Sequence, residues 1–266
     1  MRNIKLTIEY DGTNYAGWQI QNSRQASVFN RQRKTIQEVI EKTLQKILQG
    51  KIRLIASGRT DAGVHAQAQV ANFKTNSKIL LGKLQKALNA LLPEDIAITK
   101  DVEVSPDFHA RFAVKSKIYR YTILNRRWRS ALLKDKVYFY PYPLNINLMR
   151  KASRCLLGRH DFKSFCASGS DTKNTVRTIK RLTVRKLPCQ LSAVSCQPKD
   201  FSLIVIDIEA NGFLYNMVRN IVGTLIEVGR GKFQKGTVKK ILLAKNRKLA
   251  GPTAPAKGLL LVRVKY

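Results

Sequence analysis

The sequence predicts an α+β fold whose two halves share a largely antiparallel sheet, and three observations lead to this prediction. Stretches of strand-like and helix-like periodicity are mixed, without the strict strand–helix alternation of a parallel α/β protein. Both kinds of stretch occur in each half of the chain, which is compatible with two fused ferredoxin-like (RRM-like) halves. No linker rich in Gly, Ser or Pro separates these halves, which we place at residues 1–110 and 111–266.

The first half begins with a strand, because apolar and polar residues alternate from Ile4 to Tyr10. Apolar residues at helical spacing then predict a helix that starts after Thr35. Thr35 and Glu38 form a capping-box pattern at its start. The other elements expected in this half are strands over residues 53–56, 67–74 and 96–104 and a helix over residues 80–92, which ends before Pro93.

The second half repeats the mixture of strands and helices. Two short similar strings, Asp-Phe followed by a further Phe, begin at Asp107 and Asp161 and hint at an internal duplication. The expected elements are strands over residues 118–124, 178–186, 201–210 and 259–266 and helices over residues 146–157, 217–228 and 237–244.

The charge balance points to a polyanionic partner. Lys and Arg number 49 against 17 Asp and Glu, so the net charge is +32. Such a surplus opposes compaction by self-repulsion, and nucleic acid is the first candidate to neutralise it. No acid occurs between Asp107 and Asp135, between Asp171 and Asp200, or after Glu227, although each block is rich in bases.

Aromatic residues lie inside the first of these acid-free blocks. Tyr119, Tyr121 and Trp128 stand among arginines and lysines, a pattern that suits contact with unstacked RNA bases. At strand spacing the same residues are equally compatible with a hydrophobic core, and the sequence leaves both readings open.

Other classes of protein fit the sequence poorly. No apolar run approaches the roughly 20 residues that span a bilayer, and the first residues read as a strand and not as a signal peptide. The four cysteines and three histidines lack the spacing of a zinc site. We therefore expect a cytoplasmic protein with reduced thiols and no metal.

The segment from Ser57 to Ala66 is the best candidate for a catalytic site, because it is polar, contains two glycines and joins two apolar strands. Asp61 is the only acid between Glu41 and Glu94, which argues against a local pair of catalytic carboxylates or a local Mg²⁺ cluster.

The residues near Asp61 leave its role open. The neighbouring Arg59 favours the ionised carboxylate, as a nucleophile or base requires, although an Asp in a turn is also an ordinary structural feature. His65 is either a base or, with greater weight, a structural histidine.

A second polar cluster runs from Asn211 to Asn220 and leads into an apolar helix. Arg219 lies near the start of this helix, where a guanidinium is poorly placed for bulk solvent and requires a partner. Asp61, Asp207 and Glu209 are the candidate partners, and their spacing does not choose among them.

At these positions the sequence resembles the tRNA pseudouridine synthase A family. The resemblance consists of seven motifs in order over most of the chain: Tyr10-Asp11-Gly12…Tyr15…Gly17-Trp18-Gln19…Gln21, Gly58-Arg59-Thr60-Asp61-Ala62-Gly63-Val64-His65, Asn89-Ala90-Leu91-Leu92-Pro93 with Asp95-Ile96, Asp107-Phe108-His109-Ala110-Arg111-Phe112, Tyr119-Arg120-Tyr121, His160-Asp161-Phe162…Phe165, and Asn216-Met217-Val218-Arg219-Asn220-Ile221-Val222-Gly223. Residues 22–34 depart from the family pattern, because this link is longer and more basic than usual.

The resemblance implies an isomerase that converts uridine to pseudouridine at positions 38, 39 and 40 of the tRNA anticodon stem-loop. It also implies that the two halves form one catalytic domain with a basic cleft between them, that the chain is a homodimer and that no cofactor is used. By motif, Asp61 would be the nucleophile, Tyr119 would stack on the target base, and Arg219 and Arg59 would pair with Asp61 or guide the flipped nucleotide. A synthase for other RNA positions and a non-catalytic RNA-binding protein are the alternatives.

Overall fold

In a computed structural model the chain forms two compact units, which are described separately. Unit 1 comprises Met1–Lys115 and Leu260–Tyr266, and unit 2 comprises Ser116–Leu259. The structure describes residues 1–20, 33–169, 172–188 and 202–266. Most of the basic segment at 22–34, as well as Cys189 and Cys196, lies outside these residues.

Unit 1 is built on a sheet with the strand order β4-β1-β3-β10, and β2 adds to β3. β1 is antiparallel to both β3 and β4, whereas β10 pairs in parallel with β3. The strand bounds are β1 (Arg2–Tyr10), β2 (Ile55–Ala56), β3 (His65–Thr75), β4 (Ile96–Val104) and β10 (Leu259–Lys265).

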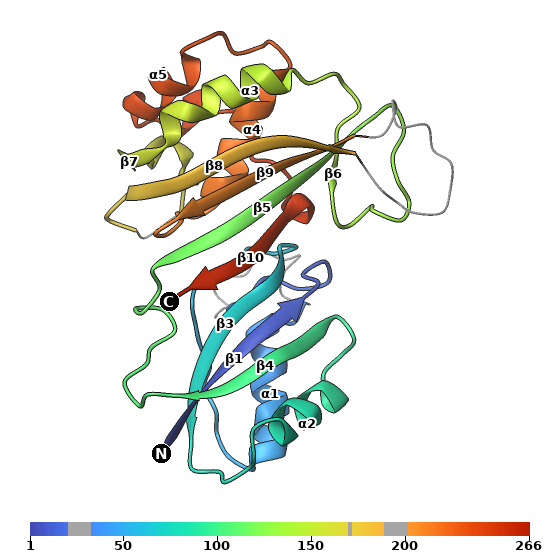
Figure 1. Cartoon of the computed structure of the whole chain (residues 1–266), viewed down its shortest axis with the longest axis vertical. Helices are drawn as coiled ribbons and strands as arrows, with labels where there is room; N and C mark the ends of the chain where they lie inside the picture. The colour runs from blue at the N-terminus through green and yellow to red at the C-terminus, as the bar shows by residue number, and fades with distance from the viewer. Residues whose placement is uncertain (21–32, 170–171, 189–201) are drawn as a thin grey trace. The chain divides into compact units, whose positions relative to one another are not determined.

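The helices of unit 1 are α1 (Ile36–Leu48) and α2 (Lys83–Leu91), which are drawn beside the strands in Figure 1. The capping box expected at the start of α1 is confirmed. The Thr35 hydroxyl accepts a hydrogen bond from the amide of Glu38 at 3.3 Å, and the Glu38 carboxylate is hydrogen-bonded to the Thr35 backbone. One face of α1 and alternate residues of β1 are buried, as their periodicities predict.

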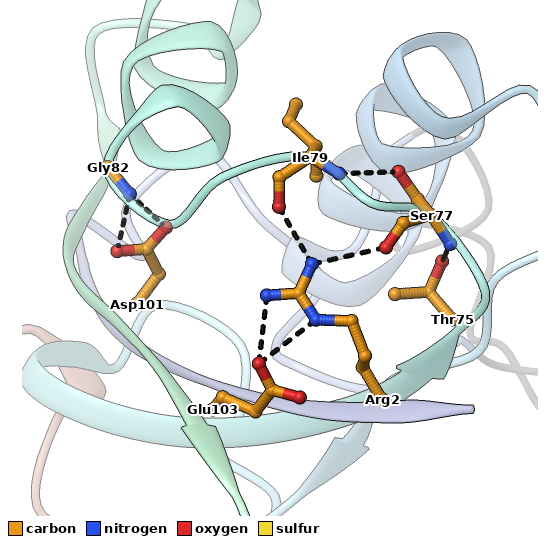
Figure 2. A network of polar contacts seen from close by, with 7 residues as sticks. All are labelled: Arg2, Thr75, Ser77, Ile79, Gly82, Asp101 and Glu103. Carbon is orange, nitrogen blue, oxygen red and sulfur yellow. Dashed lines mark hydrogen bonds and ion pairs between the residues drawn. The ribbon is translucent and has the colours of Figure 1, made fainter.

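A polar network fixes the loop between β3 and α2 (Figure 2). Arg2 donates to two carbonyls of this loop at 2.8 and 3.1 Å and pairs with Glu103 of β4 at 2.9 Å. The N-cap residue of α2 is Gly82, which has no side chain to cap the helix. The Asp101 carboxylate of β4 accepts from the Gly82 amide at 2.9 Å and so fixes the start of the helix against the sheet.

Unit 2 contains a sheet of order β5-β9-β8-β7, in which each of these neighbours is antiparallel, and the short β6 pairs in parallel with β5. The bounds are β5 (Ser116–Asn125), β6 (Tyr138–Phe139), β7 (Gly158–Asp161), β8 (Val176–Pro188) and β9 (Ser202–Ala210).

Three helices of unit 2, α3, α4 and α5, lie together on one side of its strands (Figure 1). Helix α4 is buried along nearly its whole length, with Arg219 only half-buried. Their bounds are α3 (Ile146–Ser153), α4 (Met217–Gly229) and α5 (Thr237–Ala244), and short 3₁₀ turns occur at Arg154–Leu156, Lys163–Phe165, Arg247–Leu249 and Ala256–Gly258.

The predicted α+β class with largely antiparallel pairing is confirmed. Two strands, β6 and β7, escaped prediction, and the helix expected over 146–157 ends at Ser153 because a 3₁₀ turn follows it. The aromatic residues of the first acid-free block differ in their surroundings. Tyr121 is fully buried and belongs to the core, whereas Trp128 is 69% exposed and lies beside the Arg127 guanidinium. The basic cleft stays a prediction.

Candidate active site

The segment that carries Asp61 connects β2 to β3 in unit 1, and a buried glutamine closes its base. The Ser57 amide donates to the carbonyl of Val70 at 2.8 Å. The Gln69 amide group accepts from the Ser57 hydroxyl at 2.7 Å and donates to the carbonyl of Gly58 at 3.0 Å. These bonds fix where the loop leaves the sheet.

Thr60, directly before Asp61, is held from two sides. Its hydroxyl lies 2.7 Å from the hydroxyl of Tyr10, and its carbonyl accepts from the amide of Trp18 at 3.0 Å. Burial raises the pKa of Tyr10 above its usual value, so this phenol remains a neutral partner. Asp61 is half-buried, and its carbonyl accepts from the amide of Val64 at 3.2 Å across a turn.

Two glycines of the opening motif allow the chain to lie against this loop. A Cβ atom on Gly12 would stand 2.1 Å from the carbonyl oxygen of Val64. A Cβ on Gly17 would stand 2.7 Å from the carbonyl oxygen of Thr60, and Gly17 also has a φ of +96°. The opening motif and the Asp61 loop are therefore one packed structure, which requires glycine at both contacts.

His65 belongs to the same packing. The ring is buried, and its Nδ1 lies 2.9 Å from Oδ1 of Asp11 and 3.2 Å from the amide nitrogen of Gly12. These contacts favour the structural reading of His65 over the reading as a base. Arg59, on the same loop as Asp61, is exposed.

The other two candidate residues lie in unit 2, on the packed elements β5 and α4. Tyr119 of β5 is buried, and its ring meets the ring of Phe213 edge-on, with centroids 5.0 Å apart. Arg219 lies in the first turn of α4, where its Nε donates to the carbonyl of Ala254 at 2.7 Å. Its Nη1 donates to Oδ1 of Asn216 at 2.8 Å.

Asp207, one of the candidate partners of Arg219, is engaged by two other guanidinium groups. The Asp207 carboxylate pairs with Arg120 at 2.7 Å and with Arg185 at 2.5 Å. Burial by itself raises the pKa of Asp207, but the hydrogen bonds from the two guanidinium groups hold it below its usual range. Pairing of Arg219 with Asp61 stays a prediction.

A segment that sequence reasoning overlooked holds Arg219 in place. Residues 250–255 supply the Ala254 carbonyl, and Arg247 organises this segment. The Arg247 guanidinium donates to the carbonyl of Gly251 at 3.0 Å, to Oδ1 of Asn220 at 2.9 Å and to the hydroxyl of Thr253 at 3.0 Å. We call residues 247–255 together with Asn220 the clamp. In the sequence this segment was visible only as part of the acid-free block after Glu227. Most of its hydrogen-bond acceptors are backbone carbonyls, which leave no mark in the sequence.

The clamp lies directly on α4. A Cβ on Gly223 would stand 1.7 Å from the carbonyl oxygen of Pro252, and the amide of Gly251 donates to the Thr224 hydroxyl at 2.9 Å. The last residue of the clamp is also bound, because the hydroxyl of Tyr121 in β5 donates to the carbonyl of Pro255 at 2.8 Å. The position of the Arg219 guanidinium thus depends on a loop more than thirty residues farther along the chain.

Two features are absent from the part of the chain that the structure describes, one that a metal site requires and one that a membrane crossing requires. No three His, Cys, Asp or Glu side chains in this part of the chain gather in a group suited to a metal ion. None of its helices has the combined length and apolar character that a bilayer crossing requires.

Comparison with known proteins gives consistent matches over the whole chain. A family model described as tRNA pseudouridine synthase matches residues 6–113 and 152–266. The chain is 47% identical to the tRNA pseudouridine synthase A of Thermoanaerobacter sp. (strain X514) and 46% identical to that of Acetivibrio thermocellus, in each case over 266 residues and 100% of both chains. A solved Cbf5-Nop10-Gar1 complex aligns at only 12% identity with a TM-score of 0.34, over 97% of this chain and 48% of that one.

Proposed function

The chain belongs to the tRNA pseudouridine synthase family, and we propose that it converts uridine to pseudouridine at positions 38, 39 and 40 of the tRNA anticodon stem-loop. That it is an isomerase acting on tRNA follows from the family. The choice of these positions rests on the motifs shared with the synthase A proteins.

The reaction breaks the C1′–N1 bond of uridine, turns the base and joins C5 to C1′. The proton on C5 is lost and N1 gains one, so substrate and product have the same composition. Nothing is oxidised and no phosphate is transferred, and for this reason we propose that the enzyme needs no cofactor. The target base has to leave its stack before any of these steps.

Asp61 is the proposed nucleophile, and its setting is the observation that carries the proposal. It is the single carboxylate in residues 57–66, at a turn that is braced by Tyr10, Trp18 and Gln69. One carboxylate suffices to attack C1′ or C6, or to remove the 2′ proton, and all three routes fit this residue.

The other candidates have supporting roles in this proposal. Tyr119 would stack on the target base and assist proton transfer at C5. Arg219 and Arg59 would pair with Asp61 or guide the flipped nucleotide. The clamp supports the role of Arg219, because a guanidinium that is hydrogen-bonded to Ala254 and Asn216 is held in one orientation.

The partner is tRNA, and the net charge of +32 supports tight electrostatic binding to it. By likeness to the family we also propose a homodimer that acts in the cytoplasm.

Mapping pseudouridine in tRNA from cells with and without this protein tests the function. We expect the modification to disappear at positions 38–40 in its absence and to return when purified protein is added to the unmodified tRNA. Loss at other positions only would instead establish a synthase with a different target, and unchanged tRNA would overturn the proposal.

A further inference from the structure

The loop that follows β4 in unit 1 carries the motif at residues 107–112, for which the proposed reaction provides no role. Its first part is fixed by two buried asparagines, each 1% exposed. Asn3 donates to the carbonyls of Ser105 and Phe108, both at 2.9 Å, and Asn72 accepts from the amide of Ala110 at 2.9 Å. Buried amide groups need hydrogen-bond partners, and here the loop backbone supplies them.

The chain terminus adds a third anchor on the same loop. The hydroxyl of Tyr266 donates to the carbonyl of Ala110 at 2.9 Å, and its ring packs on Phe108 with centroids 5.0 Å apart. The Lys5 ammonium lies 5.4 and 5.6 Å from the centroids of these two rings. The backbone is therefore held firmly up to residue 110.

Beyond these anchors, the loop presents an aromatic ring to solvent. Phe112 is 76% exposed, yet its ring stacks on the His109 ring at 4.2 Å with an interplanar angle of 26°. The Phe112 amide donates to the His109 carbonyl at 3.1 Å, and the Arg111 amide donates to Nδ1 of the same histidine at 3.2 Å. The Arg111 guanidinium lies 5.7 Å from the centroid of the Phe112 ring.

A single exposed apolar side chain is ordinary on a protein surface. Phe112 differs because its ring is supported by another ring and its backbone is tied to an anchored loop. A ring that is already ordered loses little conformational entropy when a flat partner stacks on it. This arrangement is typical of a binding platform.

The surrounding charge selects the kind of partner. Arg111 lies beside the ring, Lys115 ends the same loop, and the acid-free block that begins after Asp107 includes both. A nucleobase offers a flat π face and is attached to a phosphate, so it fits a ring flanked by cations better than an apolar protein surface does.

We propose that Phe112, supported by His109 and flanked by Arg111, is a stacking site for an unpaired base of the tRNA substrate. The proposal rests on the proposed function, since it takes tRNA as the ligand. It adds a contact outside the Asp61 loop, one that acts on affinity.

The test compares tRNA binding by wild-type protein with that by Phe112→Ala and Phe112→Tyr, using unmodified tRNA transcript as the probe. We expect Phe112→Ala to raise Kd about ten-fold, since one base–aromatic stack is lost, and to raise KM with little change in kcat. Phe112→Tyr keeps an aromatic ring and should bind nearly as the wild type does. Leu80→Ala, which truncates another exposed apolar residue of unit 1 (62% exposed), is the matched control and should leave Kd unchanged.

The salt dependence separates stacking from charge. Phe112→Ala removes no cation, so the slope of log K against log salt should equal that of the wild type. The association constant K itself should be lower than that of the wild type at every salt concentration. Wild-type affinity in Phe112→Ala would overturn the proposal, as would an equal loss in Phe112→Tyr. A change in sedimentation with unchanged tRNA affinity would overturn it in favour of a contact between copies of the chain. Failure of the proposed function is a separate result, because it would appear as wild-type protein that binds tRNA but forms no pseudouridine.

Discussion

Asp61 in unit 1 and Arg219 in unit 2 are positioned by different means. Around Asp61, buried side chains of the adjacent strands hold the loop: the Tyr10 hydroxyl contacts the Thr60 hydroxyl, and the Gln69 amide group donates to the carbonyl of Gly58. Around Arg219, the side chain itself is bound, by a backbone carbonyl of the clamp. The Asp61 loop thus has several supports close to it, whereas one of the two hydrogen bonds described for the Arg219 side chain comes from a distant loop that Arg247 organises.

The difference has a consequence for mutations. The loss of one brace near Asp61 should be tolerated, because Gln69, the Trp18 amide and the two glycine contacts remain. The loss of Arg247 should release several acceptors of the clamp together. The predictions below test this contrast, beginning with the largest expected effect.

Asp61→Asn should lower turnover by at least about 10³-fold, because the amide lacks the charge of a nucleophile and residues 57–66 contain no other carboxylate. The affinity for tRNA should change little or rise slightly, since a negative charge is removed. The assay is tritium release from C5-labelled uridine in tRNA, run beside a binding measurement. Glu94→Gln, which neutralises an exposed acid of the same unit, is the control. Normal release by Asp61→Asn would falsify the mechanism.

Gly223→Ala and Gly12→Ala should each destabilise the protein by roughly 3 kcal/mol or more. In both variants the new Cβ atom meets a backbone oxygen, at 1.7 and 2.1 Å, so the backbone itself has to shift to remove the overlap. Gly50→Ala is the matched control, because its Cβ would meet only one atom at 3.8 Å. Urea unfolding measures the three variants, and equal midpoints would contradict the close packing at both sites.

Arg247→Ala should lower kcat about 10- to 100-fold with a smaller effect on KM. Without its guanidinium the clamp loses four hydrogen bonds, and the carbonyl that accepts from Arg219 is no longer held in place. Arg247→Lys should restore little, since an ammonium group does not reproduce the forked geometry. Lys248→Ala removes the same charge from the neighbouring exposed residue and serves as the control. If the two alanine variants behave alike, Arg247 acts only through its charge.

Much of this architecture was predictable from the sequence because periodicity and capping are local. The start of α1 follows from Thr35 and Glu38, and α5 runs over the expected residues. β6 is too short to show an alternation. The parallel pairing of β10 with β3 joins segments almost two hundred residues apart, and no local pattern reports it.

The site was predictable only in part. The two similar strings in the sequence illustrate the limit: Phe165 is fully buried, whereas Phe112 is exposed on its platform. Burial depends on what packs against a residue and is not written in the string itself. Two hydrogen-bond partners of Arg219, the Ala254 carbonyl and the Asn216 side chain, were not predicted. The sequence suggested carboxylates as partners, but one acceptor is a backbone carbonyl, a group that every residue carries.

The smallest effects are expected where the bracing of Asp61 is redundant. Tyr10→Phe leaves the buried Thr60 hydroxyl without this partner and should cost about 1–2 kcal/mol of stability. Thr60→Val should cost less, because the Tyr10 hydroxyl keeps its hydrogen bond with Gln69. In the double variant no unpaired hydroxyl remains, so its cost should be clearly less than the sum of the two single costs. Turnover should fall less than about five-fold in all three, because the carbonyl of Thr60 still accepts from the Trp18 amide. Urea unfolding and tritium release measured on the same samples complete the cycle. Additive stability costs would mean that the two hydroxyls are not coupled, and a large fall in turnover would show that the position of Asp61 depends on this single contact.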